Sequence, residues 1–200
     1  MALIHPITQQ SFDLIDREIP NHHLSPEEYA IARRVIHTTA DFEFLDLLRF
    51  TPTAISIARA LIQAQTPIIT DVTMVKQGIL TVANQTFQND IISCLELTDQ
   101  AAPGLTRTET GMKMALERYP QALYAIGNAP TALLALCHHP CPPPLVIGVP
   151  VGFVAVEEAK ATLAQSTIPH ILTTGRKGGS PVAAAIINAL LIMAKMAKLG

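Results

Sequence analysis

The chain has 200 residues, a net charge of −2 and no cluster of lysine or arginine. Its length predicts one domain over residues 1–200, and its charge excludes nucleic acid as a partner. Hydrophobic residues make up 49% of the chain and charged residues 15%, a balance that excludes disorder and predicts buried strands and a subunit interface.

The first third of the chain carries helix signals. Ser25-Pro26-Glu27-Glu28 combines an N-cap serine, a proline at the first helical position and a glutamate three residues after the cap. Apolar residues then recur at helical spacing as far as Ile36. Further helices are expected over 42–48 and from Thr51-Pro52-Thr53 onward. We therefore expect an N-terminal helical segment.

From residue 67 the pattern changes to five short apolar runs, each followed by turn residues: 67–70, 91–95, 122–126, 145–147 and 170–172. Helices are expected between most of them, around residue 74 and over 111–118, 131–137, 157–163 and 181–197. Continuous apolar strands that alternate with helices indicate a parallel sheet covered on both faces. The expected fold is α/β, a doubly wound five-stranded parallel sheet behind the N-terminal helical segment.

Glycine-rich turns follow the last three predicted strands, at 127–131, 148–153 and 175–180. Ligands of doubly wound sheets bind at the carboxyl ends of the strands, so these turns are expected at one ligand-binding edge. The turn at 127–131 fits either an anion site or an ordinary strand-to-helix turn. The two glycines of the turn at 148–153 allow close backbone approach to a flat ligand or merely form a tight turn. The third contains Arg176 and Lys177 and suits an anion, but it matches neither the phosphate-loop nor the dinucleotide pattern.

Arg34 and His37 are three residues apart and share one face of the predicted helix. Histidine suits proton transfer near neutral pH, and arginine holds a carboxylate by two parallel hydrogen bonds. The spacing also fits an ordinary helix with one histidine and a solvated pair of arginines, Arg33 and Arg34. Asp71 either acts chemically or caps a helix, and Arg107 is either a ligand contact or a surface charge.

The three cysteines are too few for a disulfide framework and favour a reducing compartment. Residues 1–12 lack the apolar core of a secretory signal, and the apolar run 182–194 is shorter than the roughly 18–20 residues that a bilayer requires. We expect a cytoplasmic protein with no membrane partner. Cys137-His138-His139-Pro140-Cys141 lacks the second ligand pair of a zinc site, so no metal is expected.

Seven blocks of the chain, in order, resemble the precorrin-8X (cobalt-precorrin-8) methylmutase family. Each block alone is a weak signal, and seven in register are specific. The blocks are Gln10-Ser11-Phe12, Arg34-Val35-Ile36-His37, Asp71 with Met74-Val75 and Gly78-Ile79, Thr106-Arg107 with Gly111-Met112, Gly127 to Leu133, Gly148 to Val154, and Gly175 to Ser180.

The resemblance implies a flavodoxin-like homodimer that needs no added cofactor. It implies an isomerase of cobalamin biosynthesis, which moves a methyl group from C-11 to C-12 of a tetrapyrrole substrate, precorrin-8X or cobalt-precorrin-8. The product is hydrogenobyrinate or cobyrinate. By the family pattern, His37 is the catalytic proton donor and acceptor, and Ser11, Arg34 and Arg107 bind substrate.

Two other functions fit the same fold class. A nucleotide- or flavin-binding module needs a phosphate loop after the first strand, where Asp71-Val72-Thr73-Met74 is poor in glycine. A tetrapyrrole carrier without turnover would keep its binding after loss of His37. A flavin spectrum favours the first, and binding without a rearranged product favours the second.

Overall fold

The computed structural model describes residues 5–199 of the chain. Its helices are α1 (Pro6–Glu18), α2 (Pro26–Thr39), α3 (Phe44–Leu47), α4 (Ala54–Gln63), α5 (Thr73–Gln85), α6 (Arg107–Arg118), α7 (Pro130–Cys137), α8 (Val156–Gln165) and α9 (Ser180–Leu199), with a 3₁₀ helix η1 at Cys94–Glu96. Its strands are β1 (Leu48–Phe50), β2 (Ile68–Thr70), β3 (Ile91–Ser93), β4 (Leu123–Ile126), β5 (Leu145–Gly148) and β6 (His170–Thr173).

The strands form one six-stranded sheet in the order β1-β6-β5-β4-β2-β3. Strands β2 to β6 are parallel, and β1 pairs antiparallel with β6. Numbered among themselves, the five parallel strands lie in the order 2-1-3-4-5, which is also the order of flavodoxin-type sheets. The expected α/β class and the five parallel strands are confirmed, whereas the expected total of five strands is wrong.

The missed strand is β1, which follows directly after the short helix α3. It has only three residues, and its burial runs from buried Leu48 through exposed Arg49 to half-buried Phe50. So short a run carries no periodic signal, and the strand exists because Leu48 lies opposite Thr173 on β6. The helix expected over 42–48 therefore ends at Leu47.

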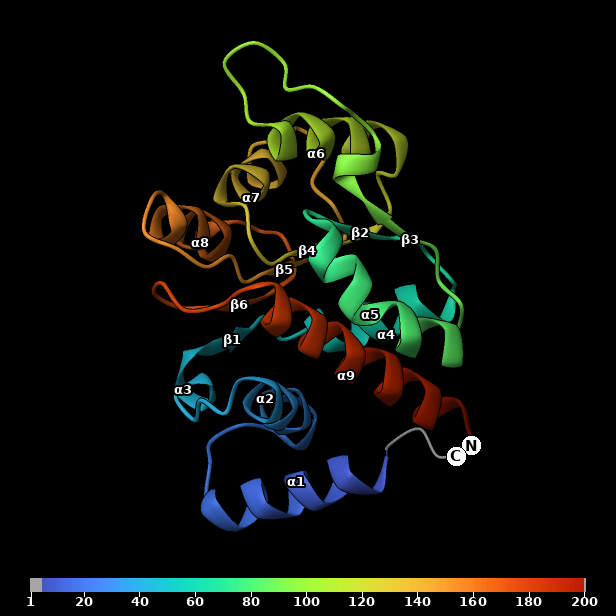
Figure 1. Cartoon of the computed structure of the whole chain (residues 1–200), viewed down its shortest axis with the longest axis vertical. Coiled ribbons are helices and arrows are strands. Elements are labelled where there is room, and N and C mark those ends of the chain that lie inside the picture. The colour runs from blue at the N-terminus through green and yellow to red at the C-terminus, as the bar shows by residue number, and fades with distance from the viewer. Residues whose placement is uncertain (1–4, 200) are drawn as a thin grey trace.

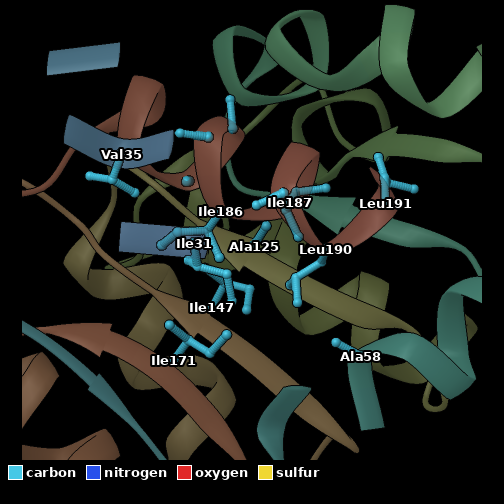
Figure 2. Close-up of a cluster of buried hydrophobic side chains, with 14 of the residues drawn as sticks. Ile31, Val35, Ala58, Ala125, Ile147, Ile171, Ile186, Ile187, Leu190 and Leu191 are labelled. Atoms are coloured by element: carbon cyan, nitrogen blue, oxygen red, sulfur yellow. The ribbon is translucent and has the colours of Figure 1, made fainter. Parts of the chain in front are cut away.

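Helices cover both faces of the sheet (Figure 1). One face packs against α2, α4, α5 and α9, and the other against α6, α7 and α8. Side chains of successive strand residues alternate between these layers, so Ala125 belongs to the α9 side and Tyr124 to the opposite side. On the α9 side, Figure 2 shows Ile186, Ile187 and Leu190 of α9 close to three residues of the sheet. These are Ala125 of β4, Ile147 of β5 and Ile171 of β6.

Helix α2 begins where its sequence predicts. The Ser25 side chain accepts from the backbone N–H of Glu28, and the Glu28 carboxylate accepts from the N–H of Ser25. Ile31 and Val35 are fully buried in the core that α9 shares. The helix ends at Ala40 in a left-handed conformation. The buried residues fix the orientation of α2 against the core. They therefore also fix the positions of Arg34 and His37, which lie outside that buried face.

Helix α9 is the central helix of its layer. Within residues 5–199, its segment Ser180–Lys198 is the one helix long and apolar enough to cross a membrane by length and composition, and 72% of the apolar window is buried inside the protein. The helix extends beyond the apolar run 182–194 at both ends, where it includes polar residues such as Ser180 and Lys195. Burial against α2, α4 and α5 accounts for its apolar composition.

The turns after β4, β5 and β6 meet at one edge of the sheet, as predicted. The N–H of Val149 donates to the carbonyl of Ile126 at 2.9 Å, and the N–H of Gly179 donates to the carbonyl of Val149 at 2.8 Å. The N–H of Gly152 donates to the carbonyl of Arg176 at 3.3 Å. These bonds join the three turns into one continuous rim at the carboxyl ends of the strands.

Candidate functional site

A groove of about 360 Å³ lies along α9 between α2 and α5. Figure 1 shows α9 running between these two helices. The lining residues are Arg34, His37 and Thr38 of α2, Met74 and Gly78 of α5, and Ser180, Pro181, Ala184, Ala185 and Asn188 of α9. Because α9 starts at Ser180, the last residue of the turn 175–180, the groove opens beside the rim of glycine-rich turns.

A second cavity of the same volume lies between α6 and α7. Its lining is Glu109, Lys113, Glu117, Leu134, Ala135, His138, His139 and Pro140. Lys113 is already paired with Glu109 at 2.9 Å, and no residue of the family pattern's catalytic or binding set lines this cavity. The groove on α9 is therefore the candidate site.

Helix α1 holds the imidazole of His37 in place. Ser11 Oγ lies 2.7 Å from His37 Nδ1, and the ring of Phe12 meets the imidazole edge-on with 5.5 Å between ring centroids. The guanidinium of Arg33 covers Phe12 at 4.5 Å and is itself bound to Asp16 at 2.6 Å. Within residues 5–199 no hydrogen bond occupies His37 Nε2, so that nitrogen is available to a ligand.

Arg34 places a cation beside this histidine. The residue is half-buried, and no carboxylate of the described residues forms an ion pair with it. A guanidinium stays charged at physiological pH even when burial lowers its pKa, as it does here. Burial, with a smaller contribution from the positive charge of Arg34, lowers the pKa of His37 below 6.5. Both effects favour the neutral imidazole in the free protein, beside a guanidinium that has no ion-pair partner among the described residues.

Replacing Arg34 with glutamine should raise the pKa of His37 toward its ordinary value, because the substitution removes one of the two causes that disfavour the imidazolium. NMR titration of the His37 ring in the free protein measures this pKa directly. Arg17→Gln, at an exposed position near the end of α1, is the matched control and should leave it unchanged. A His37 pKa that is equal or lower in Arg34→Gln would contradict the described electrostatics.

Arg107 lies apart from this groove. It begins α6, on the opposite face of the sheet from α5 and α9, and its guanidinium donates to the carbonyl of Leu95 at 3.2 Å. The side chain is exposed and does not line the groove. The structure thus brings Ser11, Arg34 and His37 together and leaves Arg107 near the end of β3.

Asp71 fills the anion site that the turn 127–131 offers. Its carboxylate is fully buried and accepts from the N–H groups of Gly127 at 3.0 Å, Asn128 at 2.7 Å and Ala129 at 2.7 Å. Burial raises the pKa of Asp71, and these three donors oppose that rise. The turn is therefore a strand-to-helix connection capped from inside. A phosphate cannot use the same N–H groups, which weakens the nucleotide-binding alternative.

The turn 175–180 has its charges partly neutralised. Arg176 pairs with Glu157 at 3.1 Å and keeps 58% of its side-chain surface exposed. Lys177 pairs with Asp41 at 2.6 Å and Glu43 at 3.0 Å, beyond the end of α2. Exposed pairs of this kind exchange readily for ligand contacts, because water and salt screen the attraction between their charges.

The cysteine–histidine segment 137–141 forms a local turn. The ring of His139 stays within its own loop, where Nδ1 lies 2.8 Å from the carbonyl oxygen of Cys141 and 3.2 Å from the backbone nitrogen of the same residue. Among residues 5–199 no group of three histidine, cysteine, aspartate or glutamate side chains is placed to hold a metal ion.

The sequence did not predict that residues of α5 and α9 line the groove. Gly78 has no room for a side chain, because an added Cβ would lie 2.8 Å from the Cβ of Ala184. The close approach of α5 and α9 depends on this pair of small residues. Their spacing within apolar helices signals only helix packing, so the sequence alone did not mark them as lining residues.

Known proteins match the chain over almost its whole length. The precorrin-8X methylmutase family model matches residues 6–193. The chain is 51% identical over 213 residues to a cobalt-precorrin-8 methylmutase of Synechocystis sp., covering 97% of this chain and 98% of that relative. It is 36% identical over 196 residues to a precorrin-8X methylmutase of Sinorhizobium sp., covering 92% of each.

Its fold is similar to the crystal structure of a precorrin-8X methylmutase from Thermus thermophilus. The TM-score is 0.88 at 37% sequence identity, and the match covers 96% of each chain. Sequence and fold thus agree on one family over the same residues that build the sheet, the rim and the groove. This chain belongs to the precorrin-8X methylmutase family.

Proposed function

We propose that this methylmutase, an isomerase of cobalamin biosynthesis, moves the methyl group at C-11 of precorrin-8X or cobalt-precorrin-8 to C-12, with His37 as the proton donor and acceptor. The products are hydrogenobyrinate and cobyrinate. The observation that carries the proposal is the placement of His37. One of its ring nitrogens is bound to Ser11, and the residue lines a groove beside Arg34, which forms no ion pair within residues 5–199.

The proposed chemistry needs a proton but no covalent nucleophile. His37 in its imidazolium form protonates a ring nitrogen of the macrocycle, which lowers the energy of the rearranging framework. The bond from the methyl group to C-11 breaks as the bond to C-12 forms, within one molecule. His37 then takes a proton back, so the reaction is an isomerisation with no net proton change. A well-placed general acid contributes about 10²–10⁴-fold to such a step.

Arg34 has two effects in this scheme. It binds a carboxylate arm of the macrocycle through paired hydrogen bonds. Once that carboxylate neutralises Arg34, the cation no longer disfavours the imidazolium, so the pKa of His37 rises when substrate binds. Substrate binding therefore favours the form of His37 that donates the proton.

Ser11 is proposed to contribute to substrate binding through the imidazole of His37, which its hydroxyl orients from α1. Arg107 is proposed to hold a carboxylate arm farther along the edge of the sheet, because it is exposed there and carries no ion pair among the described residues. A tetrapyrrole with several acidic arms is large enough to need contacts beyond one groove of about 360 Å³.

We also propose that the protein is one domain over residues 1–200, works as a cytoplasmic homodimer and needs no added cofactor. Exposed apolar side chains support a subunit interface: Ile7 and Leu14 on α1 are 67% and 57% exposed, and Phe153 and Val154 are each 84% exposed. Such groups gain most from burial in a partner. The cysteines of the described chain are all unpaired thiols, which fits a reducing compartment.

The decisive experiment is turnover by the wild-type protein. Purified protein mixed with precorrin-8X should yield the orange product hydrogenobyrinate, followed by absorption spectroscopy and identified by mass and NMR. A parallel reaction with cobalt-precorrin-8 decides which substrate is preferred. Tight binding without any rearranged product would instead establish a tetrapyrrole carrier and end the proposal of catalysis.

A further inference from the structure

Lys160 is the one buried lysine of the described chain that neither the fold class nor the proposed chemistry explains. It lies on α8 and is 3% exposed. Its ammonium donates to the carbonyl oxygens of Gly175 and Lys177, each at 2.8 Å. Both acceptors belong to the turn between β6 and α9, which we call the β6–α9 turn (residues 174–179).

The carbonyls that Lys160 binds lie in a turn, outside any helix or strand, and the carbonyl of Lys177 also accepts from the Thr173 hydroxyl at 2.9 Å. The β6–α9 turn has positive φ angles at Gly175 (+65°) and Gly179 (+122°), which glycine adopts at little cost. Gly178 passes so close to the carbonyl of Val149 that an added Cβ would lie 2.3 Å from its oxygen. A turn of this shape aims two carbonyls inward, where buried carbonyls need donors. Lys160 donates to that of Gly175 and shares that of Lys177 with Thr173.

An ammonium in that position has a cost that packing alone does not justify. Burial lowers the pKa of Lys160 to about 8, while the nearby Glu157 carboxylate acts in the opposite direction. An apolar residue usually stabilises an interior position better than a charge does. What the buried charge contributes is a fixed conformation of the β6–α9 turn, through its hydrogen bonds to two carbonyls of that turn.

The β6–α9 turn is connected to the candidate site in two ways. The turn leads directly into Ser180 and Pro181, which line the groove beside His37. It also carries Arg176, which stays 58% exposed at the rim, with Phe153 beneath its guanidinium at 5.6 Å. The turn therefore carries a guanidinium, paired with Glu157, four residues before Ser180 of the groove proposed for the macrocycle.

We propose that Lys160 is a positioning residue for substrate binding: by holding the carbonyls of Gly175 and Lys177, it fixes the β6–α9 turn so that Arg176 meets a carboxylate arm of the tetrapyrrole. This inference rests on the proposed function. Lys160 is buried beneath the turn, so it acts through Arg176. Its loss should weaken substrate binding and leave the methyl shift itself largely intact.

The test combines Lys160→Met with Arg176→Gln in a double-mutant cycle. Methionine keeps the unbranched apolar length and removes the donor. We expect Lys160→Met to raise KM for precorrin-8X about tenfold, with kcat within about threefold of wild type, because binding lost equally in ground and transition states changes KM alone. In the Arg176→Gln background the same substitution should change KM less than about twofold, since the residue through which it acts is gone.

A second variant keeps the test valid if Lys160→Met does not fold. Gly175→Ala strains the turn at its positive φ, although nothing lies within 4 Å of the added Cβ. It should raise KM in the same way while thermal unfolding stays close to wild type. The dissociation constant of the corrin product, from its visible absorption, gives a readout independent of turnover.

Three outcomes would overturn the inference: an unchanged KM in both Lys160→Met and Gly175→Ala, additive effects of Lys160→Met and Arg176→Gln, or a fall in kcat with KM unchanged. Each can occur while the wild-type protein turns over precorrin-8X, so the inference then fails alone. Absence of turnover by the wild type removes the proposed function and this inference together.

Discussion

Replacing His37 with alanine should lower the rate of the methyl shift by about 10²–10⁴-fold, the usual contribution of one general acid or base. The imidazole is the titratable group at the groove whose pKa lies closest to neutral pH, and its Nε2 has no partner among the described residues. Folding should be largely spared, because His37 is an exposed residue. Single-turnover absorption measurements with precorrin-8X separate the chemical step from binding.

The matched control is His23→Ala, which removes an exposed histidine before α2 and should leave kcat unchanged. The rate constant kcat/KM should also fall as pH rises through the lowered pKa of His37, because donation requires the imidazolium. Full activity in His37→Ala would exclude this residue from the mechanism, whatever the behaviour of Arg34.

Replacing Asp71 with alanine should lower the free energy of unfolding by about 3–5 kcal/mol. The substitution leaves the buried N–H groups of Gly127 and Ala129 and the partly buried N–H of Asn128 without an acceptor. It also removes a carboxylate from the N-terminus of α7, where the helix dipole favours negative charge. Chemical denaturation measures the loss.

Asp71→Asn should lie between wild type and Asp71→Ala, because the side-chain carbonyl still accepts while the amide nitrogen meets N–H groups that it cannot accept from. Asp99→Ala, at an exposed loop position, is the control for loss of an acidic residue and should change stability by less than about 0.5 kcal/mol. A loss below about 1 kcal/mol in Asp71→Ala would show that water replaces the carboxylate at this turn.

Local signals determined most of the element pattern. The Ser25 cap set the start of α2, and the apolar runs set β2, β4, β5 and β6 to within about a residue or two, because both are encoded in adjacent residues. The run expected at 91–95 was half right: β3 ends at Ser93, and a 3₁₀ helix takes Cys94 and Leu95. An apolar run alone does not separate a strand from a buried helical turn.

In the candidate site, too, some residues were predicted from local sequence, whereas their contacts depend on tertiary structure. Helical spacing alone placed Arg34 and His37 on one face, and family resemblance added Ser11, which lies 26 residues before His37. The hydrogen bond between them exists because α1 packs on α2, a contact that no local pattern encodes. Whether Arg107 joins them was open in the sequence, and the structure shows it outside the groove.

By itself, then, the sequence determined the alternation of strands and helices, the helix cap and the edge where the turns gather, since each depends on neighbouring residues and their periodicity. Only the tertiary structure decided that β1 joins the sheet, that Asp71 occupies the anion site of the turn 127–131, and that α9 forms the floor of the groove. The physical reason is distance along the chain: these features join residues tens of positions apart, and their energy comes from packing and buried hydrogen bonds that exist only once the layers have assembled.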